Sequence, residues 1–253
     1  MYDYVFLAIA AFFAAFVDAI VGGGGLIQVP ALFSTLPGTA PATLLGTNKF
    51  ASIWGTALAA RNYLKTVQLR WAMVLPAAAS AFVFALFGAW LVTQIPPTYL
   101  RKALPFILLA VAVYTFMKKD LGMSNQPRFK GQQELVWALL VAALIGFYDG
   151  FFGPGTGSFF VFLFVRWFGY DFLRSSAIAK VLNVACNAAA LLMFGLSGHV
   201  IWLLGAVMAV CGMAGSTLGS HLAIKHGAGF VRKMFLLVVC ALICKTTYDA
   251  FLR

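Results

Sequence analysis

Long apolar runs fill most of the chain, and short polar segments separate them. A hydrocarbon layer about 30 Å thick needs about 20 apolar residues in a helix, because each residue adds about 1.5 Å. Lipid offers backbone groups no hydrogen-bond partner, so these runs are predicted to be helices. The runs cover residues 4–21, 42–64, 69–93, 99–117, 135–152, 172–194, 200–224 and 230–250. The first run carries Asp18 and no basic segment before it, so it is expected to stay in the mature protein.

The second half of the chain repeats the first half 131 residues later, as from Asp18 to Asp149. Chance does not explain the repeat, because Asp, Lys and Trp are rare in membrane helices. The sequence therefore predicts a first transmembrane repeat at 1–117, a polar linker at 118–133 and a second repeat at 134–253. The coincident residues are Phe16 with Phe147, Gly22 with Gly153, Gly24 with Gly155, Lys49 with Lys180, Trp71 with Trp202, Gly88 with Gly219, Leu91 with Leu222, Arg101 with Arg232 and Lys102 with Lys233.

The direction of the second repeat depends on a short apolar piece that follows the glycines of each unit, at 26–34 and 158–167. If this piece folds back on the first run, three spans follow and the repeats are inverted. Eleven Lys and Arg residues then face one side and three face the other, whereas parallel repeats divide them seven to seven. Cytoplasmic loops carry an excess of Lys and Arg, which favours inverted repeats with both termini outside. The eleven are Lys65, Arg70, Lys118, Lys119, Arg128, Lys130, Arg166, Arg174, Lys225, Arg232 and Lys233, and the three are Arg101, Lys102 and Arg253.

The predicted fold is therefore an all-α integral membrane protein of two tandem, inverted repeats. Each repeat has about four helices and a broken or re-entrant first helix, which gives about eight main spans and two short helices. Composition agrees with this class, since 62% of the residues are hydrophobic, 10% are charged and the mean hydropathy is +0.93. The net charge of +11 lies mostly in short loops, where it sets orientation, so no nucleic-acid partner is expected.

Catalytic and metal-binding patterns are not recognised in the sequence. There is no phosphate-binding loop, no catalytic triad and no metal-ligand spacing, so no cofactor and no metal are expected. An intramembrane enzyme is disfavoured, because the few charges within the runs are matched between the repeats. The cysteines are read as small core residues, and Lys245 with Asp249 as a local pair. The cysteines are Cys186, Cys211, Cys240 and Cys244, and the histidines are His199, His221 and His226.

Each repeat interrupts its first helix with glycines, at 18–25 and at 149–158. Glycine and proline break a helix there and leave backbone N–H groups uncovered, and the short helix that follows presents its positive N-terminal end. Such an end binds anions. The alternative is that the glycines only allow close helix packing. Thr156 and Ser158 are expected to cap the second short helix. The candidate anion-binding residues are Gly23, Gly24, Gly25, Gly155, Thr156, Gly157 and Ser158.

Lys49 and Lys180 lie deep inside apolar runs, where an unpaired charge costs a few kcal/mol. One interpretation is a pair of buried ion pairs, Lys49 with Asp18 and Lys180 with Asp149. The other is that both lysines face a central cavity and bind a substrate anion together with neighbouring amides and hydroxyls. Asp18 and Asp149 could serve as counter-ions, backbone caps or proton carriers. The neighbouring candidates are Asn48, Ser52 and Thr56 near Lys49, and Asn183 and Asn187 near Lys180.

Four segments resemble the sulfite exporter TauE/SafE family of membrane transporters. They are residues 16–26, 45–50, 146–159 and 179–183, and the resemblance extends over essentially the whole chain. It implies a bacterial inner-membrane carrier with two repeated halves that moves sulfite, organosulfonates or related small anions. The closest similarity is to members whose substrate is unassigned.

The predicted function is a secondary transporter that moves a small anion across the inner membrane, in the direction of export. The alternatives are an anion channel, a cation-coupled anion importer and, least favoured, an intramembrane enzyme. The expected partners are a small anionic substrate and the lipid bilayer. The sequence leaves the oligomeric state open and is compatible with a homodimer.

Overall fold

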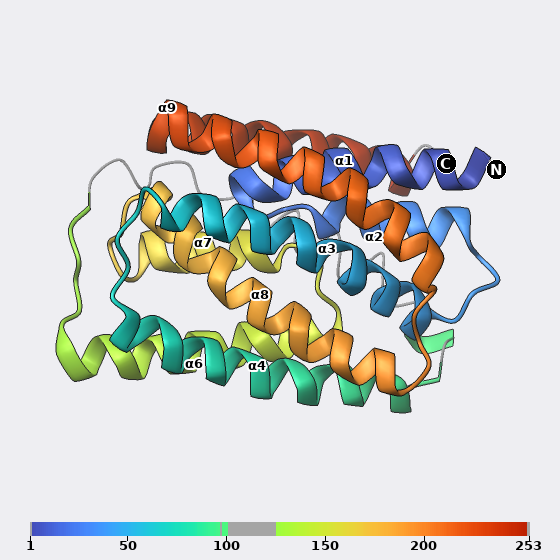
Figure 1. The fold of residues 1–253 in the computed structure, drawn as a ribbon, viewed down its shortest axis with the longest axis horizontal. Helices are drawn as coiled ribbons and strands as arrows, with labels where there is room; N and C mark the ends of the chain where they lie inside the picture. Colours follow the sequence, from blue (N-terminus) through green and yellow to red (C-terminus); the bar gives the residue numbers. More distant parts are fainter. Residues whose placement is uncertain (1, 97, 101–124, 252–253) are drawn as a thin grey trace.

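In a computed structural model, residues 2–96, 98–100 and 125–251 are described, and for most residues after Ala228 only the backbone is described (Figure 1). Within these ranges the chain is all-helical and contains no strand. The helices are α1 (Tyr2–Val21), α2 (Gly25–Thr35), α3 (Pro41–Leu64), α4 (Trp71–Gln94), α6 (Gly131–Phe151), α7 (Thr156–Arg166), α8 (Phe172–Leu196) and α9 (Trp202–Phe251).

Five helices in the described ranges are long and apolar enough to cross a membrane: α1, α4, α6, α8 and the part of α9 up to Gly227. The chain is therefore a multi-pass membrane protein. Helix α3 is 24 residues long but less apolar, because it carries polar side chains such as Lys49. The helices α2 and α7 are short and apolar. Most of the predicted run at 99–117 lies outside the described residues.

Helix bounds follow the offset of the sequence repeat. The helices α7, α8 and α9 begin 131 residues after α2, α3 and α4, respectively. Helix α4 ends just before Pro96, and at the equivalent position α9 is broken at Gly227, which has a φ of 70°. Proline lacks the N–H that a helix needs, and glycine tolerates a positive φ, so the two residues end the segment by different means. Helix α6 begins at Gly131, inside the predicted linker.

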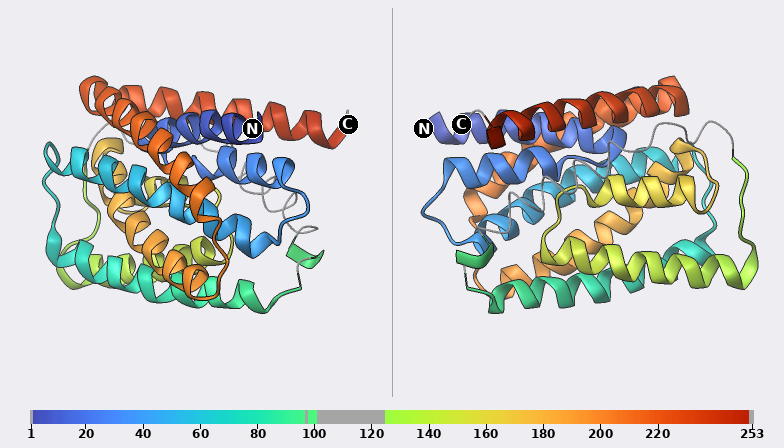
Figure 2. Two further views of the ribbon diagram at one scale, coloured as in Figure 1. Left: turned by 45° about the vertical axis from the view of Figure 1, so that its right-hand side comes forward. Right: turned by 180° about the vertical axis from the view of Figure 1, so that it is seen from behind.

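The helices form layers, and each layer contains helices from both halves of the chain. Helices α1 and α9 make one outer layer, α4 and α6 make the other, and α3 and α8 cross between them beside the short helices (Figures 1 and 2). The contacts correspond as well, since α1 packs on α9 as its counterpart α6 packs on α4. Helices α3 and α8 run in opposite directions along the long axis, as do α1 and α6 (Figure 1).

Two glycines at equivalent positions of the repeat allow the close packing within the outer layers. A Cβ at Gly88 would collide with the Phe147 carbonyl oxygen, and a Cβ at Gly219 would collide with that of Phe16. Both collisions are with backbone, so only glycine lets these helices approach so closely. The repeated Gly and Phe residues therefore mark equivalent helix contacts.

Basic residues collect at one end of the bundle. The ends of α3 and α7, the starts of α4, α6 and α8, and the Gly227 break in α9 lie together at this end (left in Figure 1). Two described loops at the opposite end, 36–40 and 197–201, contain no Lys or Arg. We call the first end the basic end. Its basic residues among those described are Arg61, Lys65, Arg70, Arg128, Lys130, Arg166, Arg174 and Lys225.

Candidate functional site

The two helix breaks predicted from the glycines are present and equivalent. Gly22 follows α1 with a φ of 83°, and Gly153 follows α6 with a φ of 93°. These left-handed values are strained for residues with a Cβ, which explains the glycine at each break. Each break turns the chain into a short helix, α2 or α7, whose N-cap residue is a glycine, Gly24 or Gly155, and therefore has no side chain to cap the helix.

The breaks of the two halves touch one another. Cα of Gly22 lies 2.6 Å from the position that a Cβ on Gly157 would take. The Ser158 backbone N–H donates to the Gly22 carbonyl at 3.0 Å, and a Cβ on Gly25 would lie 3.0 Å from Cα of Pro154. The glycines therefore permit close packing and also form the junction at which the halves meet.

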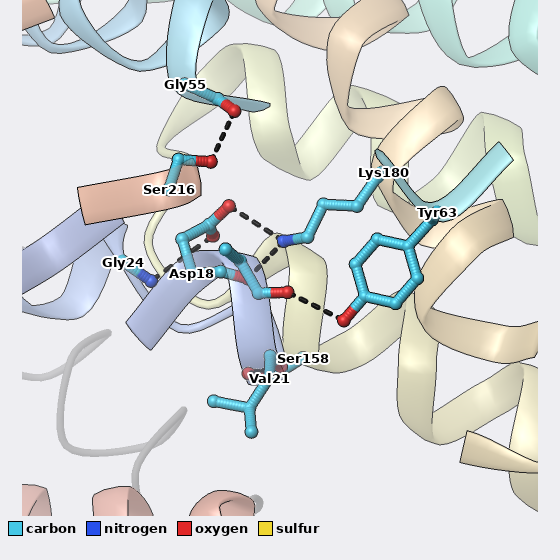
Figure 3. A network of polar contacts seen from close by, with 9 residues as sticks. Asp18, Val21, Gly24, Gly55, Tyr63, Ser158, Lys180 and Ser216 are labelled. Atoms are coloured by element: carbon cyan, nitrogen blue, oxygen red, sulfur yellow. Dashed lines mark hydrogen bonds and ion pairs between the residues drawn. The ribbon is translucent and has the colours of Figure 1, made fainter. Parts of the chain in front are cut away.

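Side chains from other helices satisfy the carbonyl groups that the break in α1 leaves open (Figure 3). Tyr63 of α3 donates to the Ala19 carbonyl at 2.9 Å, and the Ser158 hydroxyl donates to that of Val21 at 3.1 Å. Lys180 is a second donor to the carbonyl of Asp18, which also accepts from the Gly22 N–H at 2.8 Å. Unpaired carbonyls are costly in a membrane interior, so these hydrogen bonds stabilise the interruption of the helix.

The predicted caps of α7 are wrong. Thr156 donates its hydroxyl proton to the Gly153 carbonyl at 2.7 Å, and Ser158 donates to Val21 across the junction. The N-cap residue of α7 is Gly155, and Thr156 and Ser158 lie within the helix after it. Both side chains act as donors because the open carbonyls of the breaks are the groups within reach.

The two buried lysines form ion pairs, but with partners that differ from those in the sequence-based interpretation. Lys49 pairs with Asp149, and Lys180 Nζ lies 2.8 Å from Asp18 Oδ2. The predicted pairs, Lys49 with Asp18 and Lys180 with Asp149, are wrong. Each lysine of one half pairs with the aspartate of the other half, because α3 and α8 cross between the breaks. The pairs therefore bind the halves together.

Burial of the two pairs differs. The side chains of Lys49 and Asp149 are 3% and 2% exposed, and those of Lys180 and Asp18 are 1% and 18% exposed. Asp18 also accepts a bond from the Gly24 N–H at 3.3 Å, so it serves both as a counter-ion and as a partner for the broken backbone. For Lys180, the bonds to the carboxylate and the carbonyl of Asp18 indicate a structural role.

A cavity lies at the junction of the breaks, bounded by α1, α2, α3, the end of α6, the start of α7, α8 and α9. The volume that the centres of water molecules can occupy in it is about 40 Å³. One buried water needs about 10–15 Å³ of such volume. The cavity thus has room for about two to four waters. The predicted site residues that line it are Asp18, Gly24, Gly25, Asn48, Lys49, Ser52, Asp149, Gly155, Thr156, Gly157, Asn183 and Asn187.

Three predicted site residues, Gly23, Ser158 and Lys180, are not in the cavity lining. Thr56, which was expected on the face of Lys49, is in the lining with it. The structure thus gathers most of the candidates from both repeats around one small polar space.

Gln28 is a cavity residue that the sequence reasoning missed. It lies on α2, its side chain is 4% exposed, and its Nε2 amide has no hydrogen-bond partner. Asn48 is 5% exposed and has an unpaired Oδ1 in the same cavity. Buried polar groups are rarely left unpaired, so both atoms indicate space for a polar ligand. The available signal was a single Gln in the first half of an 11-residue helix whose other polar residues, Ser34 and Thr35, lie at its end.

A second polar cluster at the basic end was also missed. Glu134 of α6 is 1% exposed, pairs with Arg70 and accepts the hydroxyl proton of Tyr170. Burial raises the pKa of Tyr170, and the hydrogen bond to Glu134 adds to this effect, so the phenol remains a donor. The cluster ties the start of α4 in the first half to the second half. Among the described side chains, no group of three His, Cys, Asp or Glu is placed to hold a metal ion.

Comparisons with known proteins agree with the resemblance in sequence. Residues 7–246 match the family described as sulfite exporter TauE/SafE. The chain is 37% identical over 244 residues to "Probable membrane transporter protein ORF9" of Sinorhizobium sp, which covers 96% of this chain and 92% of that protein. No solved structure matches the chain.

Two further relatives carry similar names. "Probable membrane transporter protein YfcA" of Escherichia coli K12 is 35% identical over 244 residues, or 96% of this chain and 89% of the relative. A "Probable membrane transporter protein" of Haemophilus influenzae is 36% identical over 242 residues, or 94% and 92%. All three are named as transporters rather than as enzymes.

Proposed function

The chain belongs to the sulfite exporter TauE/SafE family of membrane transporters, and on this basis we propose that it is a secondary transporter of a small anion in the inner membrane. The substrate binds in the cavity at which the two helix breaks meet. The observation that carries the proposal is the unpaired, buried Nε2 amide of Gln28 in that cavity. A buried amide N–H group needs a hydrogen-bond acceptor, and an oxygen atom of a bound anion would supply one.

Several other groups of the cavity can donate to an anion or attract it. Lys49 keeps ammonium protons beyond the one it shares with Asp149, since an ammonium group has three. Thr56 and Ser52 add hydroxyls, and the N-terminal ends of α2 and α7 add positive dipoles. Because each lysine already has an aspartate partner, the site is close to neutral without substrate. It therefore suits a small anion that is bound by donors more than by net charge.

The small volume of the cavity favours a carrier over a channel. A channel needs a continuous water-filled path, whereas a carrier closes around its site and opens to one side at a time. A cavity for a few waters between two halves fits a closed state of a carrier. Saturable flux with counter-flow in proteoliposomes is expected, and flux that never saturates would favour the channel.

Binding is tested by a thermal-shift screen of the purified protein with sulfite, sulfate, sulfoacetate, taurine, acetate and lactate. At least one anion should raise the melting temperature. Gln28→Met should weaken its binding about tenfold or more, as expected for a lost hydrogen bond to a charged group. Gln132 is an exposed residue on α6, so Gln132→Met is the matched control and should bind normally. Equal binding by both variants would contradict the proposed site.

Export is the proposed direction of transport. A membrane potential is worth about 2.3 kcal/mol per charge per 100 mV, so a divalent anion leaving a cell at about −100 to −150 mV gains about 5–7 kcal/mol. Asp18 and Asp149 are the deep acidic groups available for cation coupling, and both have lysine partners. Proteoliposome flux under potassium–valinomycin clamps should increase when the potential favours anion exit. Uptake abolished by Asp149→Asn under a proton gradient would instead indicate a cation-coupled importer.

Inverted repeats with both termini outside are the proposed topology. The opposite directions of equivalent helices support it, as does the excess of Lys and Arg at the basic end, which we place in the cytoplasm. In a cysteine-free background, a membrane-impermeant thiol reagent added to intact cells should label Gly38→Cys and leave Lys130→Cys unlabelled. The reverse pattern would place the basic end outside.

A further inference from the structure

A groove of about 520 Å³ lies on the surface at the basic end, between α3, the start of α4 and α8. It shares no lining residue with the central cavity. Its walls are mostly apolar and include Leu64, Val181 and Val184. A space of this size is within the range of ligand-binding pockets. The groove runs along membrane-spanning helices, so lipid chains can reach it directly.

Positive charges stand at one end of the groove. Arg61 and Lys65 belong to its lining, are four residues apart at the end of α3, and are exposed. Neither forms an ion pair with a described acidic side chain. Trp71, which is 44% exposed, lines the groove beside them. Tryptophan and basic side chains together are typical of the level of the lipid headgroups.

The other half of the chain provides an internal comparison, because the repeat places equivalent residues at the opposite end of the bundle. There Phe50 stands in place of Val181, and its ring packs on Trp202 with the ring centroids 5.0 Å apart. Leu192 and Leu196 stand in place of Arg61 and Lys65. An aromatic ring thus occupies the equivalent space, and the equivalent positions carry no charge. The basic groove is specific to one side of the membrane.

We propose that this groove binds one anionic phospholipid from the leaflet at the basic end. The phosphate of the headgroup contacts Arg61 and Lys65, and an acyl chain lies along the apolar wall formed by Val181 and Val184. Basic pockets between transmembrane helices on the cytoplasmic side are suited to anionic headgroups. The groove touches α3 and α8, the helices that carry Lys49 and Lys180, so a bound lipid would contact both halves.

The test uses the full-length protein, delipidated in detergent and titrated with phosphatidylglycerol or phosphatidylcholine while bound lipid is counted by native mass spectrometry. One phosphatidylglycerol should bind tightly. The double variant Arg61→Gln with Lys65→Gln should weaken it about thirtyfold, as expected for two basic residues near a headgroup. The matched control is Arg128→Gln with Lys130→Gln, which removes two exposed charges of the same end that do not line the groove. The control should bind as the unchanged protein does.

Two further measurements test whether lipid binding needs the groove and the acyl chains as well as the two charges. Val181→Phe keeps both charges and fills the groove as Phe50 does in the other half, so it should also lose the bound lipid. Glycerol 3-phosphate carries the same phosphate without acyl chains and should not compete at millimolar concentration. Equal binding of phosphatidylcholine, competition by glycerol 3-phosphate, or equal loss in the Arg128 and Lys130 control would each overturn the proposal.

Discussion

Replacing Lys49 by Met removes the positive member of an ion pair whose side chains are 3% and 2% exposed. The carboxylate of Asp149 would then be a buried charge without its counter-ion. Breaking a buried pair in this way costs about 3–5 kcal/mol, because the remaining charge stays desolvated. For a protein of this size, about 2–4 °C of melting temperature corresponds to 1 kcal/mol. The expected loss is therefore about 6–20 °C.

The pairing of each lysine with the aspartate of the other half predicts which second substitution restores the lost stability. Adding Asp149→Asn to Lys49→Met removes the stranded charge and should restore stability to within about 1 kcal/mol of the unchanged protein. Adding Asp18→Asn should not restore it, since Asp18 pairs with Lys180. The second double variant should be less stable than Lys49→Met alone, because it disrupts both pairs.

Melting temperatures of the purified variants in one detergent give the comparison, with Lys130→Met as a control for the loss of an exposed lysine. The control should change stability by no more than about 0.5 kcal/mol. If Asp18→Asn rescued Lys49→Met and Asp149→Asn did not, the crossed pairing would be refuted. Transport separates the roles of Lys49. A double variant that regains stability but not anion flux would support substrate contact, and recovery of both would remove Lys49 from the proposed site.

Two further changes test the junction and the basic end. Gly157→Ala places a Cβ against the backbone of Gly22 and should cost about 1–3 kcal/mol, whereas Gly38→Ala meets no atom within 4 Å and should change the melting temperature little. Equal effects of the two would contradict the close contact. Tyr170→Phe removes a donor to the buried carboxylate of Glu134 and should cost about 1–3 kcal/mol in thermal unfolding. No change would show that this bond contributes little.

Much of the architecture was predictable because lipid restricts the backbone to so few choices. The apolar runs gave helices, and the repeat gave the positions of both breaks, since Gly22 and Gly153 each take a positive φ. Which aspartate meets which lysine was not predictable. In sequence, Asp18 and Lys49 belong to one repeat, and only the crossing of α3 and α8 brings each lysine to the other half. The pairing depends on tertiary arrangement, which periodicity does not contain.

The repeat marks polar residues that occur in both halves, and it gives no signal for a site residue that occurs in one half alone. Gln28 has Phe159 as its counterpart, so it is not one of the polar residues that coincide between the repeats. Glu134 has Asp3 as its counterpart, but it lies at the edge of the predicted linker, where a charge is expected. In both cases the informative feature was burial, 4% for Gln28 and 1% for Glu134. Burial of one polar residue beside a helix end cannot be read from spacing alone.

The crossed ion pairs also bear on the ancestry of the chain. In a two-fold interface between identical subunits, each residue of a contact occurs twice with the roles of the subunits exchanged. The pairs Lys49 with Asp149 and Lys180 with Asp18 follow this rule between the two halves. A single ancestral unit with one lysine and one aspartate could therefore satisfy both charges by dimerising with a copy of itself. Gene duplication would have preserved that contact while freeing each copy to diverge, as Gln28 and Phe159 have done.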